Sequence, residues 1–169
     1  MLHETLSRMD QPGLLRDPTL EDVPEAKQKD WDVRGFVARA GWTEDDFVAF
    51  RKSRANQDLF IRFFAAAGGR LAAGSDAPNR MLVPGYSEHR ELELLVRAGL
   101  TPREALRAAT RNAAVLIGVD SLGLLAPGKV ADLLVLSKDP LVDIRNTRAI
   151  AGVMARGYLL DVDSIRATW

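Results

Sequence analysis

The sequence predicts an α/β fold in which a mainly helical body contains a buried strand and is followed by a small β unit. Three observations lead to this prediction. Apolar residues recur at helical spacing over residues 47–67, and Gly68-Gly69 ends the pattern. The short apolar segment 70–74 follows, so helix, glycine break, strand and loop come in the order of half a βαβ unit. From residue 119 onward, short apolar segments alternate with glycine turns, a pattern typical of antiparallel strands.

The first half of the chain is expected to contain one long helix. Residues 1–42 show little periodicity, and we expect a loop with one short helix there. Thr43 is the expected N-cap of the long helix, because its hydroxyl can accept a hydrogen bond from a first-turn amide. The acidic residues 44–46 would then lie at the positive end of the helix dipole. We expect the wide apolar stripe of this helix to lie in the core. The stripe consists of Phe47, Val48, Phe50, Leu59, Phe60, Ile61, Phe63 and Phe64.

Two more helices are predicted after the strand. Ser87 is expected to cap a helix over residues 88–98, whose glutamates 88, 91 and 93 we expect on an exposed face. Thr101, Pro102 and Glu104 form a complete capping-box pattern for a helix over residues 105–117.

The last part of the chain is expected to be β-structure. Residues 131–136 read as a strand that ends before Asp139-Pro140. Residues 149–162 read as a hairpin around Arg156-Gly157, where the glycine supplies the positive φ that a tight turn needs.

Composition excludes several classes of protein. Lys+Arg and Asp+Glu are both 23, so the electrostatic basis for binding nucleic acid or an anionic membrane is missing. The chain has no cysteine, which rules out disulfides, thiolate zinc sites and cysteine nucleophiles within it. The first ten residues lack the apolar core of a signal peptide, and no apolar run is long enough to span a bilayer. We therefore expect a soluble chain.

Asp76 and His89 are the candidate functional residues. Asp76 stands where the strand of residues 70–74 opens into a loop, and it could equally be a loop carboxylate in an Asx-type turn before Pro78. His89 could equally be a solvated polar residue near a helix N-terminus. His3 is the only other histidine, and we do not expect it to bind a metal.

Several short sequence motifs together resemble the C-terminal part of the metal-dependent amidohydrolase superfamily, in its imidazolonepropionase- and prolidase-like branch. They are GSDA (74–77), EL (91–92), AGLTP (98–102), AAT (108–110), NAA (112–114) and PGKVADL (127–133). The resemblance runs from about Leu71 to Gly157 and is much weaker over residues 15–69.

The resemblance implies a (β/α)8 metallohydrolase barrel with a composite β-sandwich. Residues 1–118 would belong to the barrel, with residues 71–74 as its eighth strand, and residues 119–169 would form the C-terminal half of the sandwich. Asp76 would be the catalytic aspartate at the end of that strand, contacting the metal and its bound water and moving the proton of that water. His89 would lie near the substrate.

The resemblance also implies a divalent metal, zinc in the complete enzyme, and a small amide or dipeptide substrate. A barrel of this kind takes ~250 residues, and catalytic zinc needs about three protein ligands. We therefore expect the chain alone to bind zinc weakly, and to self-associate or to need a missing N-terminal portion. Two functions stay open: the C-terminal piece of an enzyme that hydrolyses C–N bonds, or a catalytically inactive remnant that serves as an interaction module.

Overall fold

The computed structural model describes residues 1–166. Helical segments make up most of it. Those that precede the Asp76 loop are α1 (Leu2–Leu6), the 3-10 helices η1 (Pro12–Arg16) and η2 (Pro18–Asp22), α2 (Glu25–Asp30), α3 (Val33–Ala40) and α4 (Glu44–Ala66). Those that follow it are α5 (Tyr86–Arg97), α6 (Pro102–Arg107), the π-helical η3 (Ala108–Asn112), α7 (Ala113–Leu116), the 3-10 helix η4 (Ile144–Arg148) and α8 (Val162–Arg166).

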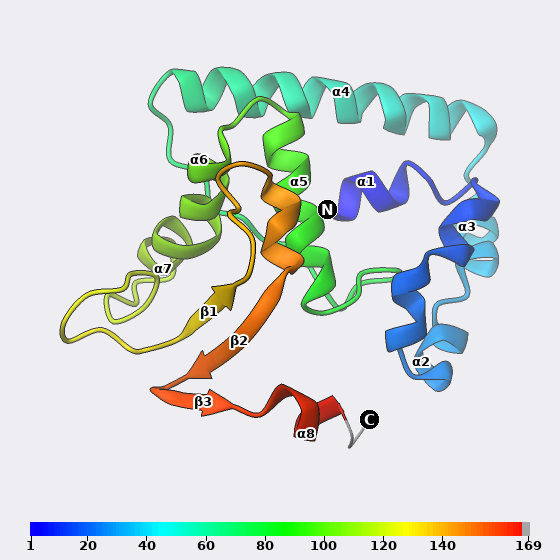
Figure 1. The fold of residues 1–169 in the computed structure, drawn as a ribbon. Coiled ribbons are helices and arrows are strands. Elements are labelled where there is room, and N and C mark those ends of the chain that lie inside the picture. The colour runs from blue at the N-terminus through cyan, green and yellow to red at the C-terminus, as the bar shows by residue number, and fades with distance from the viewer. Residues whose placement is uncertain (167–169) are drawn as a thin grey trace.

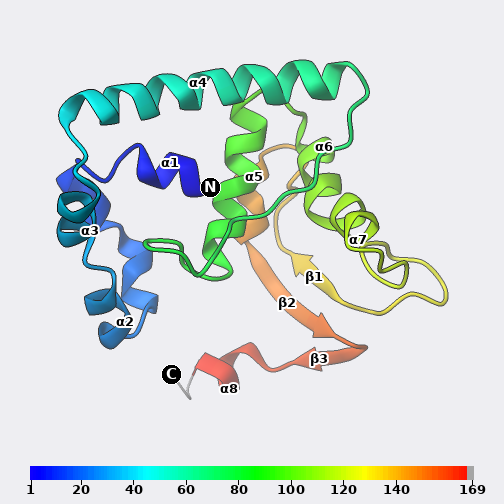
Figure 2. The ribbon, with the colours of Figure 1, turned by 180° about the vertical axis from the view of Figure 1, so that it is seen from behind.

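Helices and strands occupy different parts of the molecule. The long helix α4 lies along one edge, and α5 runs from beneath it toward a small sheet at the opposite edge (Figure 1; Figure 2 shows the reverse side). The sheet consists of β1 (Leu133–Leu136), β2 (Ile150–Ala155) and β3 (Tyr158–Leu160), paired antiparallel in the order β1-β2-β3. The expected alternation of helices with parallel strands is therefore absent from residues 1–166, which form a helical body with one antiparallel sheet.

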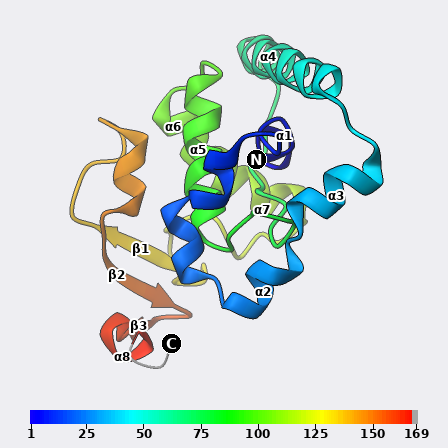
Figure 3. The same cartoon turned by 90° about the vertical axis from the view of Figure 1, so that its right-hand side faces the viewer.

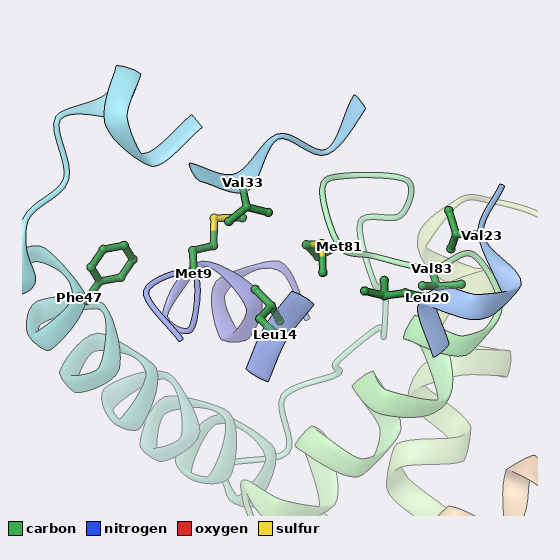
Figure 4. Packing of buried hydrophobic residues seen from close by; sticks show 8 residues of the cluster. All are labelled: Met9, Leu14, Leu20, Val23, Val33, Phe47, Met81 and Val83. Atoms are coloured by element: carbon green, nitrogen blue, oxygen red, sulfur yellow. The ribbon is translucent and has the colours of Figure 1, made fainter. Parts of the chain in front are cut away.

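Residues 1–42 are far more ordered than the sequence suggested. Five short helical segments replace the expected loop with one short helix, and they surround a buried apolar cluster with α4 and the loop after Asp76 (Figure 4). The cluster is made up of Met9, Leu14, Leu20, Val23, Val33, Phe47, Met81 and Val83. The periodicity of apolar residues does not reveal these helices, because each segment is too short to repeat an apolar position. Packing against distant parts of the chain stabilises them.

A compact ionic cluster joins α1 to α4 and α5, and α1 lies between them (Figure 3). The buried carboxylate of Glu4 lies 3.3 Å from Arg54 Nε and 3.0 Å from Arg97 Nη2. Arg90 Nη2 lies 3.9 Å away, and Arg54 also pairs with Asp58. Burial by itself would raise the pKa of Glu4, but the hydrogen bond from Arg97 and the surrounding guanidinium charges outweigh burial and lower it.

Helix α4 begins as predicted, but its apolar stripe is only partly buried. Thr43 forms a capping box with Asp46 at the start of the helix, and Phe47 is 3% exposed. Toward the other end, Phe60 is 64% exposed and Phe63 is 63% exposed. The prediction that the whole stripe lies in the core is wrong, because within residues 1–166 this half of the helix packs only Ile61 and Ala65 against the second buried cluster and leaves Phe60 and Phe63 on its other side exposed.

The predicted strand over residues 71–74 is not formed. The segment leads from α4 to the loop of Asp76, and its hydrogen bonds go to the helical region after α6. Ala73 N donates to Ala108 O at 3.0 Å, and Asn112 Nδ2 donates to Leu71 O at 2.7 Å. A barrel strand needs a neighbouring strand on each side. The described residues supply none here.

The helices that follow agree with the sequence in part. Helix α5 begins at Tyr86, with Gly85 rather than Ser87 at the N-cap. Thr101 and Glu104 form the expected capping box on α6. The single helix predicted over residues 105–117 is instead divided into α6, η3 and α7.

The C-terminal hairpin has the predicted form. Strands β2 and β3 pair Val153 with Leu160 and Ala155 with Tyr158. The turn between them has positive φ at both Arg156 (50°) and Gly157 (84°). Two consecutive positive φ angles match the two-residue hairpin turns that follow the right-handed twist of strands.

Candidate functional site

Asp76 lies at the start of an exposed loop between the segment 71–74 and α5. Its side chain is exposed, and its φ of 62° is in the left-handed region, which few residues other than glycine adopt. The Ala77-Pro78 peptide bond that follows is cis. The backbone therefore turns sharply at the residue that the sequence identified.

Asn79 holds the Asp76 side chain in place. Asn79 Nδ2 donates to Asp76 Oδ2 at 3.0 Å and to the Asp76 carbonyl oxygen at 3.2 Å. The Asn79 backbone amide donates to the same carbonyl at 3.1 Å. The Asx-type turn considered from the sequence would have used the aspartate side chain as acceptor for a nearby amide. Here the Asp76 side chain is still the acceptor, but its donor is the side-chain amide of Asn79 and not a backbone N–H.

Glu88 on α5 fixes the other side of this loop. The backbone N–H of Ser75 acts on its carboxylate. Burial raises the pKa of Glu88 and the charge of Glu91 raises it further, whereas the ammonium group of Met1 and, less strongly, the Ser75 N–H lower it. The expectation that residues 88, 91 and 93 form an exposed face is wrong, since all three glutamates are partly buried and Glu91 and Glu93 form ion pairs.

Sequence reasoning missed Glu88 as a residue that positions the loop. Its contact with Ser75 joins residues thirteen positions apart through the turn of the loop, and no local pattern signals such a pairing.

His89 points to the C-terminal part of the chain. Its Nδ1 lies 2.9 Å from Thr147 Oγ1, and the Thr147 hydroxyl donates its one proton to Ile144 O at 2.9 Å. Nδ1 is therefore the donor, and the neutral ring keeps an acceptor at Nε2. Burial lowers the pKa of His89, the charge of Arg148 lowers it further, and Glu93 opposes the shift.

The two candidate residues do not interact with each other. Among residues 1–166, no hydrogen bond or ion pair joins Asp76 to His89. His3, the other histidine, lies against Phe50, with its Nε2 3.2 Å from the Phe50 carbonyl oxygen. The roles of Asp76 and His89 therefore stay predictions.

The residues present do not fit a metal ion by themselves. No group of three or more histidine, aspartate or glutamate side chains in the described part of the chain is arranged to hold one. A catalytic zinc ion takes about three protein ligands, and the exposed carboxylate of Asp76 could supply at most one of them.

An open hollow adjoins the loop of Asp76. Pro78, Val83 and Tyr86 form one side of it, and Val23 and Trp31 form the other. Its exposed lining is mainly apolar, but it also includes the charged residues Glu21, Glu25, Lys27 and Asp30, so the hollow offers contacts to both uncharged and charged parts of a small molecule. None of the described helices has both the length and the hydropathy to cross a membrane.

Comparison with known proteins identifies the family. The Amidohydrolase family matches residues 46–160, a segment that includes Asp76, His89 and all three strands. An imidazolonepropionase from Deinococcus deserti is 44% identical over 104 residues, which is 61% of this chain and 23% of that protein. An ochratoxinase from Aspergillus niger is 39% identical over 99 residues, 55% of this chain and 20% of that protein.

Solved structures show the same relationship. A Bifidobacterium longum protein assigned as a prolidase matches with a TM-score of 0.64 and 35% identity, over 78% of this chain and 35% of that one. Phenylurea hydrolase B matches with a TM-score of 0.56 and 28% identity, over 64% of this chain and 28% of that one. The chain thus spans about a fifth to a third of the length of these relatives. Because the family match covers more than half of the chain, this protein belongs to the Amidohydrolase family.

Proposed function

We propose that this chain is the C-terminal part of a metal-dependent amidohydrolase that hydrolyses a C–N bond in a small amide or dipeptide. The observation that carries the proposal is the placement of Asp76. It lies in the GSDAP loop, inside the family-matched segment, with an exposed carboxylate held by Asn79. The relatives include an imidazolonepropionase, an ochratoxinase and a Xaa-Pro dipeptidase, and this range supports the substrate class.

In this proposal Asp76 transfers a proton. Its carboxylate accepts a proton from the attacking water and returns it to the leaving nitrogen of the substrate. Asn79 orients the carboxylate by donating to Oδ2, and Glu88 fixes the preceding turn through the Ser75 amide. His89 lies one residue after Glu88 on α5 and contributes to the substrate end of the site through its free Nε2.

The unpaired surfaces of the chain support a larger catalytic unit. The segment 71–74 lacks strand neighbours among the described residues, and the second half of α4 presents Phe60 and Phe63 to solvent. A further polypeptide that supplied the remaining strands of a (β/α)8 barrel would pair the segment and cover the helix. The same polypeptide would have to provide the metal ligands, because residues 1–166 do not.

The test begins at the gene. The DNA on both sides of the coding region should contain, in frame or in a neighbouring gene, a barrel strand with a His-x-His pair. The chain and that segment should then be produced together, purified as one species, and assayed for zinc content and for hydrolysis of a panel of amides and Xaa-Pro dipeptides.

The decisive comparison uses two matched substitutions. Asp76→Asn should lower kcat about 10²–10⁴-fold, the range for loss of a general acid–base group. Asp120→Asn removes an exposed carboxylate in the same family-matched segment and should leave kcat unchanged. Equal activities of the parent and Asp76→Asn would refute the role of Asp76.

The second candidate is an inactive remnant that serves as an interaction module. It is favoured by the lack of a metal-ligand group among the described residues and by the exposed aromatic residues of α4. A locus without any His-x-His segment, together with a purified chain that neither retains zinc through dialysis nor hydrolyses the panel, would establish this candidate over the first.

A further inference from the structure

A partly enclosed cavity of about 220 Å³ lies away from the Asp76 carboxylate, between the N-terminal segments and α5. Its walls come from α1, the residues around η1 and η2, the loop after Asp76, and the first turns of α5. The polar groups in these walls include three arginines: Arg8, Arg90 and Arg148.

The arginines around the cavity have too few carboxylate partners to neutralise all of their positive charge. Arg90 and Arg148 share one carboxylate, that of Glu93, with Arg90 Nη1 at 2.6 Å. Arg90 also lies 3.9 Å from Glu4, but that carboxylate is already shared with Arg54 and Arg97.

Arg8 adds to this positive excess. It forms no ion pair among the residues that the structure describes, and it is partly buried. Asp17, the other carboxylate of the lining, accepts hydrogen bonds from both the backbone N–H and the hydroxyl of Thr19. The walls therefore carry more positive than negative charge.

Two buried hydroxyl groups also line the cavity. Thr5 is 2% exposed and Ser87 is 1% exposed, and within residues 1–166 no hydrogen bond uses either hydroxyl. Among the described residues only Arg80 Nε is a buried side-chain polar atom without a hydrogen-bond partner, so neither hydroxyl is a fully enclosed unpaired group and both stay accessible from the cavity. A ligand with acceptor oxygens would satisfy both hydroxyls.

We propose that this cavity binds a small oxyanion, either a phosphate or the carboxylate of a small organic acid. Arginine is suited to this task because its planar guanidinium donates two parallel hydrogen bonds to a carboxylate or phosphate. Arg8 supplies the unpaired guanidinium, and Ser87 and Thr5 supply hydroxyl donors. The volume suits a ligand of a few heavy atoms, since sites for drug-sized molecules begin at about 300 Å³. The proposal depends neither on Asp76 nor on hydrolytic activity.

Isothermal titration calorimetry of the full chain tests this proposal with inorganic phosphate and with succinate. Sodium chloride at matched ionic strength serves as the reference for non-specific salt effects. We expect saturable binding of at least one of the two anions at millimolar concentration or below, and the tighter one identifies the source of the oxyanion. Heats that chloride reproduces, or no saturation with either anion, would overturn the proposal.

Variants locate the site. Arg8→Gln should weaken binding at least tenfold, and Ser87→Ala should weaken it severalfold. Arg103→Gln, which removes the same charge from an exposed position on α6, should change the affinity less than twofold. Circular dichroism shows whether each variant is folded, and Ser87→Ala decides the question if Arg8→Gln does not fold. Unchanged affinity in a folded Arg8→Gln or Ser87→Ala variant would contradict the site.

Discussion

Replacing Glu4 by glutamine tests the ionic cluster that attaches α1 to the helical body. Breaking a buried ion pair by removing one partner costs roughly 3–5 kcal/mol. We expect the lower end, about 3 kcal/mol, because Arg54 keeps Asp58 as a partner and Arg97 is 48% exposed and therefore partly screened by solvent. For a chain of this size, that loss corresponds to a decrease in Tm of about 6–12 °C.

The assay is thermal and urea unfolding followed by circular dichroism at low protein concentration. Asp30→Asn is the matched control, because it removes a carboxylate from the exposed Lys27–Asp30 pair, whose side chains are about 70% exposed. The control should unfold like the parent. A Glu4→Gln variant that is as stable as the control would refute the view that this cluster anchors α1.

The pH dependence of the stability difference between the parent and Glu4→Gln gives a second check. The pKa of Glu4 is lowered in the folded chain from its ordinary value of 4.5, so its contribution to stability is fully present above pH 4.5. The contribution is lost as the pH falls through the folded pKa, below 4.5. The stabilities of the parent and of Glu4→Gln should therefore converge in acid, and a difference that stays constant there would contradict the ionic origin of the effect.

Three further predictions concern other parts of the chain. Gly123 and Gly128 share a φ of 79°, but an added Cβ meets a backbone oxygen at 2.7 Å only at Gly123. In urea unfolding, Gly128→Ala should lower the free energy of unfolding by about 1 kcal/mol, and Gly123→Ala should lower it by roughly 1–3 kcal/mol more. Equal losses in the two variants would contradict the clash at Gly123. The parent should self-associate in size-exclusion chromatography with light scattering, whereas Phe60→Ser/Phe63→Ser should be mainly monomeric, and a monomeric parent would refute this. The His89 ring should titrate below pH 6.5 by NMR, because burial and a neighbouring guanidinium lower its pKa, and stability should fall as the pH drops below 6.5; a midpoint at or above 6.5 would contradict the described burial.

Features that depend on a few neighbouring residues could be predicted from the sequence. The N-cap at Thr43, the capping box at Thr101 and the turn at Arg156-Gly157 each depend on residues at most three positions apart, and all three were predicted correctly. The family resemblance read from the sequence was also confirmed, because the Amidohydrolase family matches residues 46–160.

Features that depend on distant partners could not be predicted in this way. The aromatic residues of α4 have the spacing of a core helix whether or not anything covers them, so periodicity could not reveal the exposure of Phe60. The segment 71–74 has the composition of a buried strand, but a strand forms only beside another strand. The contacts of Glu88 with Ser75 and of His89 with Thr147 join separate segments that only the folded chain brings together.

The contact between His89 and Thr147 crosses the boundary at residues 118 and 119 that the sequence suggested. The apolar cluster around it crosses the same boundary, since Ile144 packs with Leu92 and Leu95 of α5. Cleavage at the Gly118–Val119 bond would therefore divide one shared interior, and neither product would retain its full set of buried contacts. The helical body and the strand-containing end should consequently melt in a single cooperative transition.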